Sequence, residues 1–291
     1  SIGRVLALAF PDRVAQRRPG NAPRYLLRNG TGAILPDGDP VGGDAFIVVA
    51  ESDGRVPESR VFLAASLAAD DLEHDFSGQI TVTPVVVWDD ERGVRASSER
   101  RLGALVLATR PLPSPDPEAV AGAVAGAVRR LGLDILPWTQ STIRLRERLA
   151  FVHYHDPSWP DMSDAALAGA LLRGLHAELG AVRSAADMRR LDVTAALRGL
   201  LSWDQRSRFD RIAPTHLTAP TGTRVPIDYG DPAAPRVAIR LQELFGCRAT
   251  PVVFDGRVPL TLHLLSPANR PVQVTRDLPG FWTSSYFDVR K

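Results

Sequence analysis

The residue types that carry nucleotide chemistry are nearly absent from this sequence, and lysine is the clearest case. A phosphate-binding loop of the GxxxxGK[ST] type needs a lysine whose ammonium group reaches the β- and γ-phosphates. Lys291 is the only lysine among the 291 residues, so no such loop is present. The run Asp71-Leu72-Glu73-His74 looks like a D-E-x-H motif, but leucine stands where the second acidic residue belongs. We therefore expect no ATPase site in this chain.

Other catalytic arrangements have little support. His153 and His155 lie two residues apart on a predicted helix, so they point to different faces and cannot readily share a metal ion. No CxxC or HExxH pattern accompanies them, and we expect helix-end packing or solvation. A Ser–His–Asp hydrolase lacks its GxSxG elbow. Cys247 has no recognisable nucleophile context and is best explained as a small buried apolar side chain.

Arginine is the residue type left to bind a ligand, and it gathers near the N-terminus. Guanidinium groups bind phosphates bidentately, and a tyrosine ring can stack on a base. We therefore predict a nucleic-acid-binding group here. Its members are Arg13, Arg17, Arg18, Tyr25 and Arg28, with Arg24 between them. The alternative is that these arginines are solvated charges on an edge strand.

A second group of candidates lies near the C-terminus. It consists of Arg270, Gln273, Arg276 and Trp282, with Thr275 and Tyr286 nearby. Gln273 and Thr275 share one strand face by period two, whereas Arg276 falls on the other face. The alternative is that the aromatic side chains pack as core or against a further domain. The arginines of the helical middle are interpreted as a solvated helix face.

Composition limits the class of protein. A hydrophobic share of 44% suits a globular chain of two or three domains. No run of 18 apolar residues is present, and the apolar start is too short for a signal peptide. A single cysteine rules out an internal disulfide framework and fits a reducing compartment. We therefore expect a cytoplasmic protein with no membrane partner and no metal site.

Charge is spread unevenly along the chain although the net charge is only +2. Residues 1–112 carry 13 basic and 15 acidic side chains, residues 113–213 carry 13 and 12, and residues 214–291 carry 9 and 6. The C-terminal part is therefore the most phosphate-attracting portion, although the excess is small.

Residues 1–112 are predicted to form a β-rich domain. Short strands are expected over 24–28, 31–35, 45–51 and 61–66, with Asn29-Gly30 as a tight turn. A short helix over 70–76 precedes a long hairpin whose arms are 80–88 and 94–107. Short strands at this spacing are typical of a small barrel or sandwich.

Residues 113–212 are predicted to form a helical domain. The proline-rich run 112–117 marks its start, because proline can continue neither a helix nor a central strand. Helices are expected from Pro117 to a stop at Gly132, over 139–155, and from Ser163 to Gly180. Two more begin at Ser184 and Asp192, and the last is broken near Trp203 before the segment ends near Ile212.

Residues 213–291 are predicted to form a small α+β domain. Strands over 215–219 and 223–229 form a hairpin, a helix over 236–245 ends at Gly246, and a short strand covers 252–254. Apolar residues then alternate from Val258 to Leu264, a strand follows over 271–275, and Asp277 caps a final helix. The predicted fold class is thus α+β.

The exact order of residues in the C-terminal stretch is more specific than its hydrophobic pattern. RVPLTLHLLSPANRPVQVTRDLPGFW, followed by SYFDVRK, closely resembles the C-terminal region of the HrpB family of bacterial DEAH-box ATP-dependent helicases. Residues 213–246 resemble the preceding part of that region. LALAFPDRVAQRR (Leu6–Arg18) resembles the point where the helical ratchet domain of such helicases passes into their OB-like domain. The resemblance covers nearly the whole chain and is weakest in the helical middle.

The resemblance implies an OB-like β-barrel in residues 1–112 and a family-specific domain in residues 213–291. It implies a non-motor helicase portion that helps to hold single-stranded RNA, or DNA, and braces the motor lobes. ATP and Mg²⁺ would bind those lobes, so no cofactor is expected here. The family continues past Lys291 with a basic and aromatic tail. The alternative is a scaffold or protein-interaction module that binds no nucleic acid, and a stand-alone small-molecule enzyme is a distant third.

Overall fold

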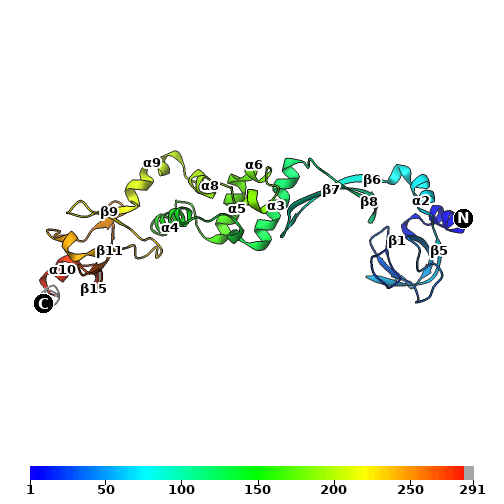
Figure 1. Ribbon diagram of the computed structural model, residues 1–291, viewed down its shortest axis with the longest axis horizontal. Helices are drawn as coiled ribbons and strands as arrows, with labels where there is room; N and C mark the ends of the chain where they lie inside the picture. The colour runs from blue at the N-terminus through cyan, green and yellow to red at the C-terminus, as the bar shows by residue number, and fades with distance from the viewer. Residues whose placement is uncertain (285–291) are drawn as a thin grey trace. The chain divides into compact units, whose positions relative to one another are not determined.

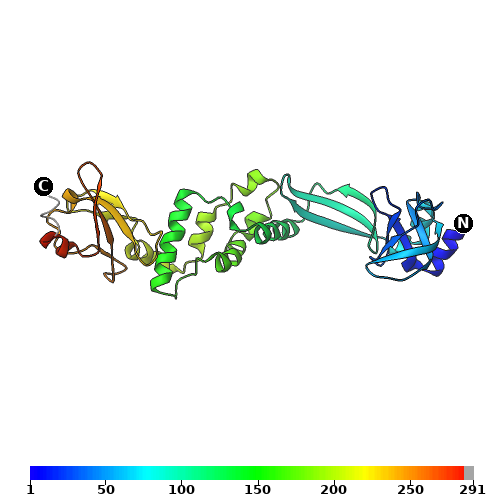
Figure 2. The ribbon, with the colours of Figure 1, turned by 90° about the horizontal axis from the view of Figure 1, so that it is seen from below.

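The computed structural model describes residues 1–284 and divides the chain into two compact units (Figures 1 and 2). The first unit comprises residues 1–87 and 95–116, and the second comprises residues 88–94 together with the chain from Pro117 onward. The predicted boundary after residue 112 falls close to this division. The predicted boundary at 212/213 instead runs through the second unit, where the helical and α+β segments share contacts.

A closed five-stranded barrel forms the centre of the first unit. Its strands are β1 (Val14–Arg17), β2 (Arg24–Leu27), β3 (Gly32–Ile34), β4 (Phe46–Ser52) and β5 (Glu58–Ser66). They follow the order β1-β2-β3-β5-β4, and β4 closes the barrel by pairing with β1. The pair β3–β5 is parallel and the other pairs are antiparallel. The predicted short strands are confirmed, as is the turn at Gly30, whose φ is +91°.

The barrel strands separate two apolar cores. Because successive side chains of a strand point to opposite faces, alternate residues fill the barrel interior. The interior residues are Ala15, Tyr25, Leu27, Ala33, Leu35, Ile47, Val49 and Val61. The outer core lies against α1 (Ile2–Ala9) and α2 (Ala69–Asp75), and includes Val14, Phe46, Val48, Leu72 and Phe76.

A close approach to β5 and an ion pair with α2 hold α1 in place. A methyl group on Gly3 would overlap the carbonyl oxygen of Ser66 in β5, so only glycine lets the helix lie so near the strand. Arg4 donates from Nε and Nη2 to the carboxylate of Asp75 in α2, each at 2.7 Å. This bidentate pair lowers the pKa of Asp75 below its ordinary value.

The predicted long hairpin is a three-stranded sheet of β6 (Thr81–Asp89), β7 (Gly93–Leu102) and β8 (Leu105–Pro111). The prediction of one continuous arm over 94–107 is therefore wrong. The chain turns at Gly103, whose φ is +59°, and a methyl group there would lie 2.6 Å from the carbonyl oxygen of Arg28. Gln16 of the barrel then pairs with β8, because its amide donates to the Val106 carbonyl at 2.7 Å and accepts from the Val106 N–H at 3.1 Å.

Helices make up the first part of the second unit. They are α3 (Pro117–Leu131), α4 (Gln140–His155), α5 (Asp164–Gly174), α6 (His176–Leu179), α7 (Ala185–Met188), α8 (Val193–Gly199) and α9 (Trp203–Ile212). The predicted starts are confirmed, since Ser163, Ser184 and Asp192 each cap a helix through the side chain. The single helix predicted from Ser163 to Gly180 is two helices, α5 and α6, separated at Leu175.

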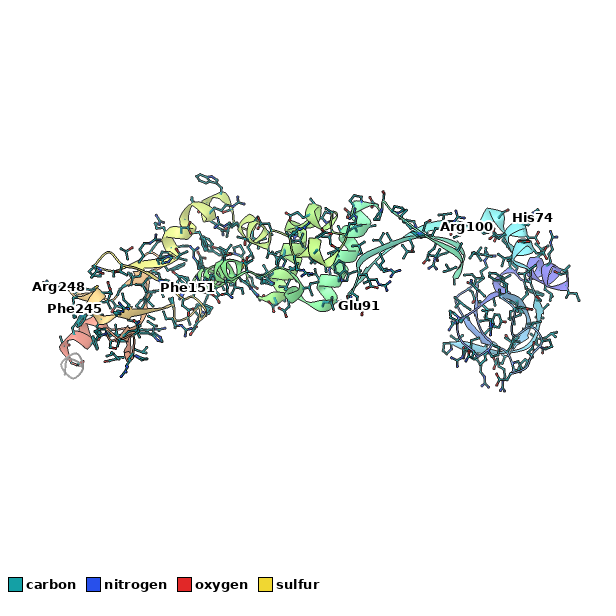
Figure 3. The ribbon with its side chains drawn as sticks, viewed as in Figure 1. His74, Glu91, Arg100, Phe151, Phe245 and Arg248 are labelled. Carbon is teal, nitrogen blue, oxygen red and sulfur yellow. The ribbon has the colours of Figure 1, made fainter. Side chains whose placement is uncertain are left out.

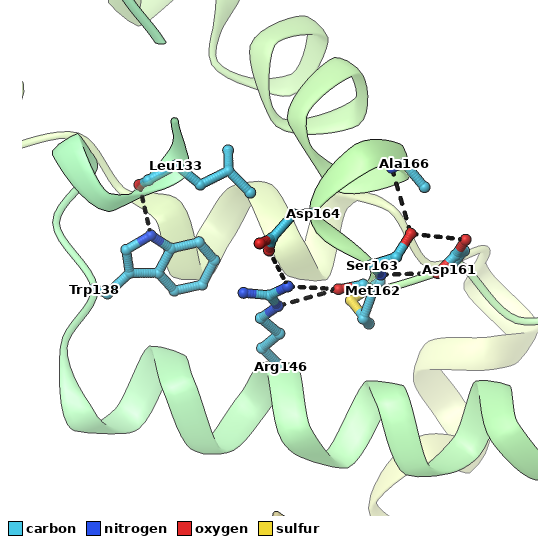
Figure 4. Close-up of polar contacts among 8 residues, drawn as sticks. All are labelled: Leu133, Trp138, Arg146, Asp161, Met162, Ser163, Asp164 and Ala166. Carbon is cyan, nitrogen blue, oxygen red and sulfur yellow. Dashed lines mark hydrogen bonds and ion pairs between the residues drawn. The ribbon is translucent and has the colours of Figure 1, made fainter. Parts of the chain in front are cut away.

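Arg146 ties α4 to the start of α5 (Figure 4). Its Nη2 donates to the Met162 carbonyl at 2.7 Å and to the carboxylate of Asp164 at 2.5 Å. Its guanidinium lies 5.3 Å from the ring centroid of Trp138, whose indole N–H donates to the Leu133 carbonyl. The arginine thus joins two helices and the segment that precedes them.

Short strands follow the helices. They are β9 (His216–Thr218), β10 (Arg224–Pro226), β11 (Arg236–Arg240), β12 (Val252–Val253), β13 (Val258–Pro259), β14 (Thr261–Leu265) and β15 (Pro271–Thr275). The helix α10 (Leu278–Thr283) comes last and is capped by Asp277, as predicted. The predicted alternation is also confirmed, because Val258, Leu260, Leu262 and Leu264 are all buried.

The helix predicted over 236–245 is wrong. Residues 236–240 form β11, which pairs in parallel with β14, and residues 241–244 form a short 3₁₀ turn. Val237 and Ile239 are 0% and 2% exposed, whereas the arginines on either side of them are exposed. This period of two, with β-branched residues at the buried positions, favours a strand over a helix.

A buried arginine joins the helices to the strands. The side chain of Arg148 in α4 is only 9% exposed, and its Nε donates to the Ala213 carbonyl at 2.8 Å just beyond the end of α9. Its Nη2 also bonds the Asp210 carboxylate at 2.7 Å, and the guanidinium lies 4.4 Å from the Phe209 ring centroid. One turn further along α4, Phe151, which Figure 3 labels, packs against Tyr229 and Phe254 of the C-terminal segment.

We expect Arg148→Ala to lower the free energy of unfolding by about 2–4 kcal/mol, because it leaves a buried carbonyl without its charged donor and opens a cavity. Chemical denaturation measures the effect. The matched control is Arg144→Ala, an exposed arginine of the same helix, which should change stability by less than about 0.5 kcal/mol. Equal effects of the two substitutions would contradict the role given to Arg148.

Candidate nucleic-acid interface

The predicted arginines of the barrel lie at two ends of one strand pair. The backbone N–H of Arg28 donates to the carbonyl of Val14, so Arg13 and Arg28 lie together at one end of β1 and β2. Arg17 pairs with Tyr25 at the other end, next to Arg18. With a rise of about 3.3 Å per residue, the two ends are roughly 13 Å apart. The five candidates therefore do not form one cluster.

Arg13 and Arg28 have structural partners. Arg13 donates from Nη1 to the Ala50 carbonyl at 2.7 Å and lies 4.8 Å from the Phe10 ring centroid. Arg28 donates from Nη2 to the Gln79 side chain at 2.7 Å and lies 5.5 Å from the Phe76 ring centroid. Both guanidinium groups are thus used to brace the barrel against neighbouring segments.

Tyr25 is a core residue, and its predicted role in stacking on a base is wrong. Its side chain is 0% exposed and belongs to the barrel interior. Its hydroxyl donates toward the carbonyls of Val41 and Asp44, each at 3.0 Å, and so fixes the loop that precedes β4. Burial raises the pKa of this hydroxyl, and the nearby charge of Arg17 opposes that shift. No face of the ring is open to a ligand.

An outward-facing row of side chains crosses four neighbouring segments of the barrel. The N–H of Arg18 donates to the Arg24 carbonyl at 2.8 Å, which continues the β1–β2 register by one residue. Arg24 is the register partner of Ile34 in β3, and Ile34 is the partner of Arg60 in β5. Partners in register share a face, and Tyr25 and Val61 next to them point inward. We call Arg18, Arg24, Ile34 and Arg60 the arginine row.

The arginine row concentrates positive charge that the chain compensates only in part. All three arginines are exposed. Arg24 lies 3.7 Å from the carboxylate of Glu58, but among residues 1–284 neither Arg18 nor Arg60 forms an ion pair. Like charges on directly opposite residues destabilise a strand pair, so a bound polyanion would relieve the repulsion between Arg18 and Arg24. With strands about 4.8 Å apart, the row spans roughly 14 Å.

Sequence reasoning found Arg18 but missed the other arginines of the row. Arg24 was noted only as a neighbour of the candidates, and Arg60 was not noted. The alternation of Arg24-Tyr25-Leu26-Leu27 could have separated the outward arginine from the inward tyrosine. Arg60 could not have been found in this way, because its place beside Ile34 depends on the parallel pairing of β3 with β5.

The C-terminal candidates do not form a single surface either. Arg276 donates from Nε to the Thr261 hydroxyl at 2.8 Å, and Trp282 donates from its indole N–H to the Cys247 carbonyl at 3.0 Å. Arg270 is exposed at the turn before β15, and Gln273 is half-buried opposite Leu264. Trp282 also packs against Phe245 and Phe281, which favours the core interpretation. Tyr286 lies outside the described residues.

The described residues were also compared with the requirements of a metal site and of a membrane-spanning helix. Among residues 1–284, no group of three or more potential metal ligands comes together. His153 donates from Nδ1 to the Trp159 carbonyl at 2.7 Å, and His155 packs against Phe151, in line with the packing predicted for both. Within the same described range, no helix is both long enough and apolar enough to cross a bilayer.

Comparison with protein families identifies the class of protein as the C-terminal part of an ATP-dependent helicase. A model described as "ATP-dependent helicase C-terminal" matches residues 175–291, and one described as "ATP-dependent RNA helicase HrpB, connector region" matches residues 79–112. The chain belongs to the HrpB family, which confirms the resemblance seen in the sequence.

Similar proteins support this membership. The chain is 37% identical over 295 residues to the ATP-dependent RNA helicase HrpB of Escherichia coli K12, covering all of this chain and 36% of that protein. Two HrpB crystal structures from E. coli match with TM-scores of 0.60 and 0.58, at 37% and 34% identity, covering 99% and 100% of this chain. The chain covers 36% and 37% of those two structures. It therefore spans about a third of the length of these relatives.

We expect Tyr25→Phe to destabilise the first unit by about 1–2 kcal/mol, because the hydroxyl no longer bonds the loop carbonyls. The same substitution should leave the affinity for single-stranded RNA unchanged, since the ring has no exposed face. Denaturant unfolding and fluorescence anisotropy measure the two effects. A loss of RNA affinity with unchanged stability would show that the ring contacts a base.

Proposed function

We propose that this chain is a non-motor C-terminal portion of an RNA helicase, which holds single-stranded RNA and braces the motor lobes. The observation that carries the proposal is the 37% identity over the whole chain to an ATP-dependent RNA helicase. ATP and Mg²⁺ are bound by the other part of such a protein, and this chain hydrolyses no nucleotide itself. A cytoplasmic location stays a prediction.

The barrel is the RNA-binding element of this proposal, and its strand order supports an OB-type assignment. OB-folds are five-stranded barrels that bind oligonucleotides across strands 2 and 3 and through the loops after strands 1 and 4. The arginine row crosses β2 and β3, and Arg18 lies in the loop that follows β1. Arg55, whose side chain is 82% exposed, lies in the loop that follows β4. The positive charges thus coincide with the surface that this fold uses.

The bracing role rests on apolar surface in the first unit. Ile2, Val5 and Leu8 form one face of α1 and are 78%, 68% and 59% exposed, although they are the kind of residue that a helix buries. A groove of about 460 Å³ runs beside them and is lined by Leu6, Leu63 and Ala64, among others. Exposed apolar patches of this kind mark interaction surfaces. The occupant we propose is the motor part of the helicase, since this chain spans only 36% of its relative.

The second candidate function is an interaction module that binds no nucleic acid. The same apolar face of α1 favours it, because that surface needs no charged ligand. Phosphate contacts release counterions and give binding a steep dependence on salt, whereas apolar docking does not. The salt dependence of any RNA binding therefore separates the two functions.

We expect single-stranded RNA to bind the chain at low salt and to lose affinity as salt rises. The variant Arg18→Gln/Arg24→Gln/Arg60→Gln should bind about tenfold or more weakly. Each lost phosphate contact should also reduce the slope of log K against log salt by about 0.7, or roughly 2 for three contacts. Fluorescence anisotropy with labelled RNA, measured over a series of salt concentrations, gives both quantities.

The matched control is Arg92→Gln/Arg95→Gln/Arg110→Gln, which removes the same charge from three exposed arginines of β7, β8 and the turn before β7. It should keep the wild-type salt slope. An equal loss in the control would show that net charge, not the arginine row, attracts RNA. Absence of binding at low salt would contradict the RNA-holding role and favour the interaction module.

We expect Val5→Asp/Leu8→Asp to destabilise the full-length helicase but not this chain alone. In the isolated chain both side chains are exposed, so the melting temperature should change little. In the full-length protein the charges would fall in a buried interface, and the melting temperature should drop by several degrees. Val82→Asp, at an exposed position of β6, is the control and should have no effect in either protein. Equal melting temperatures in the full-length proteins would refute the docking of α1.

A further inference from the structure

A pocket in the second unit brings together two arginines and a histidine from three segments. It has a volume of about 280 Å³ and lies where the end of α4 meets the turn between β12 and β13. His155 comes from α4, Phe254 and Arg257 come from the turn, and Arg276 follows β15. The backbone around Ala233 and Pro259 completes the wall. The proposed function makes no use of this pocket.

Neutral groups hold both arginines of the pocket. The guanidinium of Arg257 lies 4.5 Å from the ring centroid of Phe254. Arg276 donates from Nε to the Thr261 hydroxyl at 2.8 Å and from Nη2 to the Ala233 carbonyl at 3.3 Å. Within the described residues, no carboxylate lies within ion-pair distance of either guanidinium. The two positive charges are therefore positioned but not neutralised.

Neighbouring arginines of the same unit form ion pairs, unlike the two arginines of the pocket. Arg211 lies 3.4 Å from the carboxylate of Asp255, and Arg236 lies 2.8 Å from that of Asp228. Asp156 is a further acidic side chain near Arg257. Hydrogen bonds from Ser158 are the main cause of its lowered pKa, and the charge of Arg257 is the smallest cause. The local carboxylates thus have closer partners than the two pocket arginines, and the pocket keeps an excess of positive charge.

His155 adds an unsatisfied polar atom to the same pocket. Its Nε2 is buried and has no hydrogen-bond partner within the described chain. The ring is fixed by Phe151 and Phe254, at centroid distances of 4.9 and 5.5 Å. Burial lowers the pKa of the imidazole below its ordinary value, a hydrogen bond to the Pro232 backbone opposes this shift, and the charge of Arg257 adds to it. A buried nitrogen without a partner is costly, and with the ring proton on Nε2 this atom would donate to a ligand oxygen.

The turn that carries Arg257 has an unusual backbone. Phe254 and Asp255 have φ values of +54° and +50°, in the left-handed region, which aspartate adopts occasionally and a bulky residue such as phenylalanine rarely. Such residues cost free energy and cluster at ligand-binding sites. Here the conformation buries the Phe254 ring and places Arg257 over its face.

We propose that this pocket binds a phosphate group, through the guanidinium groups of Arg257 and Arg276 and the Nε2 of His155. Guanidinium forks match the oxygens of a phosphate, and two of them balance its negative charge. A base is not recognised here, because the Phe254 ring is 3% exposed and its face is covered by Arg257. The phosphate comes from an RNA backbone or from a free phosphate ester. The site is independent of the arginine row, which belongs to the first unit.

Isothermal titration calorimetry with inorganic phosphate tests the pocket directly. We expect saturable binding in the millimolar range at low salt. The variant Arg257→Gln/Arg276→Gln should weaken it at least about tenfold. The matched control Arg224→Gln/Arg270→Gln removes the same charge from exposed arginines that do not line the pocket, and it should bind as the wild type does. Circular dichroism shows whether each variant is folded, and Arg276→Gln alone serves if the double variant is not.

Competition between phosphate and RNA identifies the source of the phosphate. A short labelled RNA is titrated in the background of the arginine-row substitutions, so that the barrel contributes little. Displacement of this RNA by inorganic phosphate supports a backbone phosphate, and phosphate binding without RNA binding supports a free phosphate ester. Phosphate binding that does not saturate, or an equal loss in the control variant, overturns the proposal. Neither result bears on RNA binding by the barrel.

Discussion

The hydrogen bonds from Arg148 to the carbonyl of Ala213 hold the second unit together. A helix leaves its last carbonyls without partners, and a buried carbonyl of this kind costs free energy unless a donor reaches it. Arg148 supplies a charged donor from α4 at 2.8 Å, where α9 passes into the C-terminal strands. Phe151, one turn later, then packs against Tyr229 and Phe254. The helical and α+β segments therefore behave as one unit, and the phosphate pocket between them depends on this joint.

The arginines differ in the partners that their guanidinium groups contact. Arg148, Arg146 and Arg4 are held by carboxylates and carbonyls, and they serve the fold. Arg13 and Arg28 have carbonyl, amide and aromatic partners, and they serve it too. Among the described residues, the arginine row on the barrel has one ion pair, from Arg24 to Glu58, and the two arginines of the pocket have none. An anionic ligand is the physical complement that both groups lack.

The arginine row on the barrel and the apolar face of α1 are surfaces of one unit with different chemistry. The arginine row across β2, β3 and β5 is cationic, and under the proposed function it holds a strand of RNA through phosphate contacts. The face of α1 is apolar and suits the dry surface of a protein. The proposed function uses both kinds of contact, the first to hold RNA and the second to hold the motor lobes.

The amino-acid sequence alone predicts the family, most of the elements and the absence of a nucleotide-binding lysine, because these depend on local hydrophobic patterns and on the identity of the residues. Helix caps such as Ser163 and Asp192 and the alternation before Leu264 were predicted correctly for this reason. Residues 236–240 were predicted as a helix, although pairing with β14 makes them a strand. The sites were decided by tertiary structure. Tyr25 turned inward, Arg60 came beside Ile34, and His155 met Arg257 only because strand pairing and packing join residues far apart in the chain.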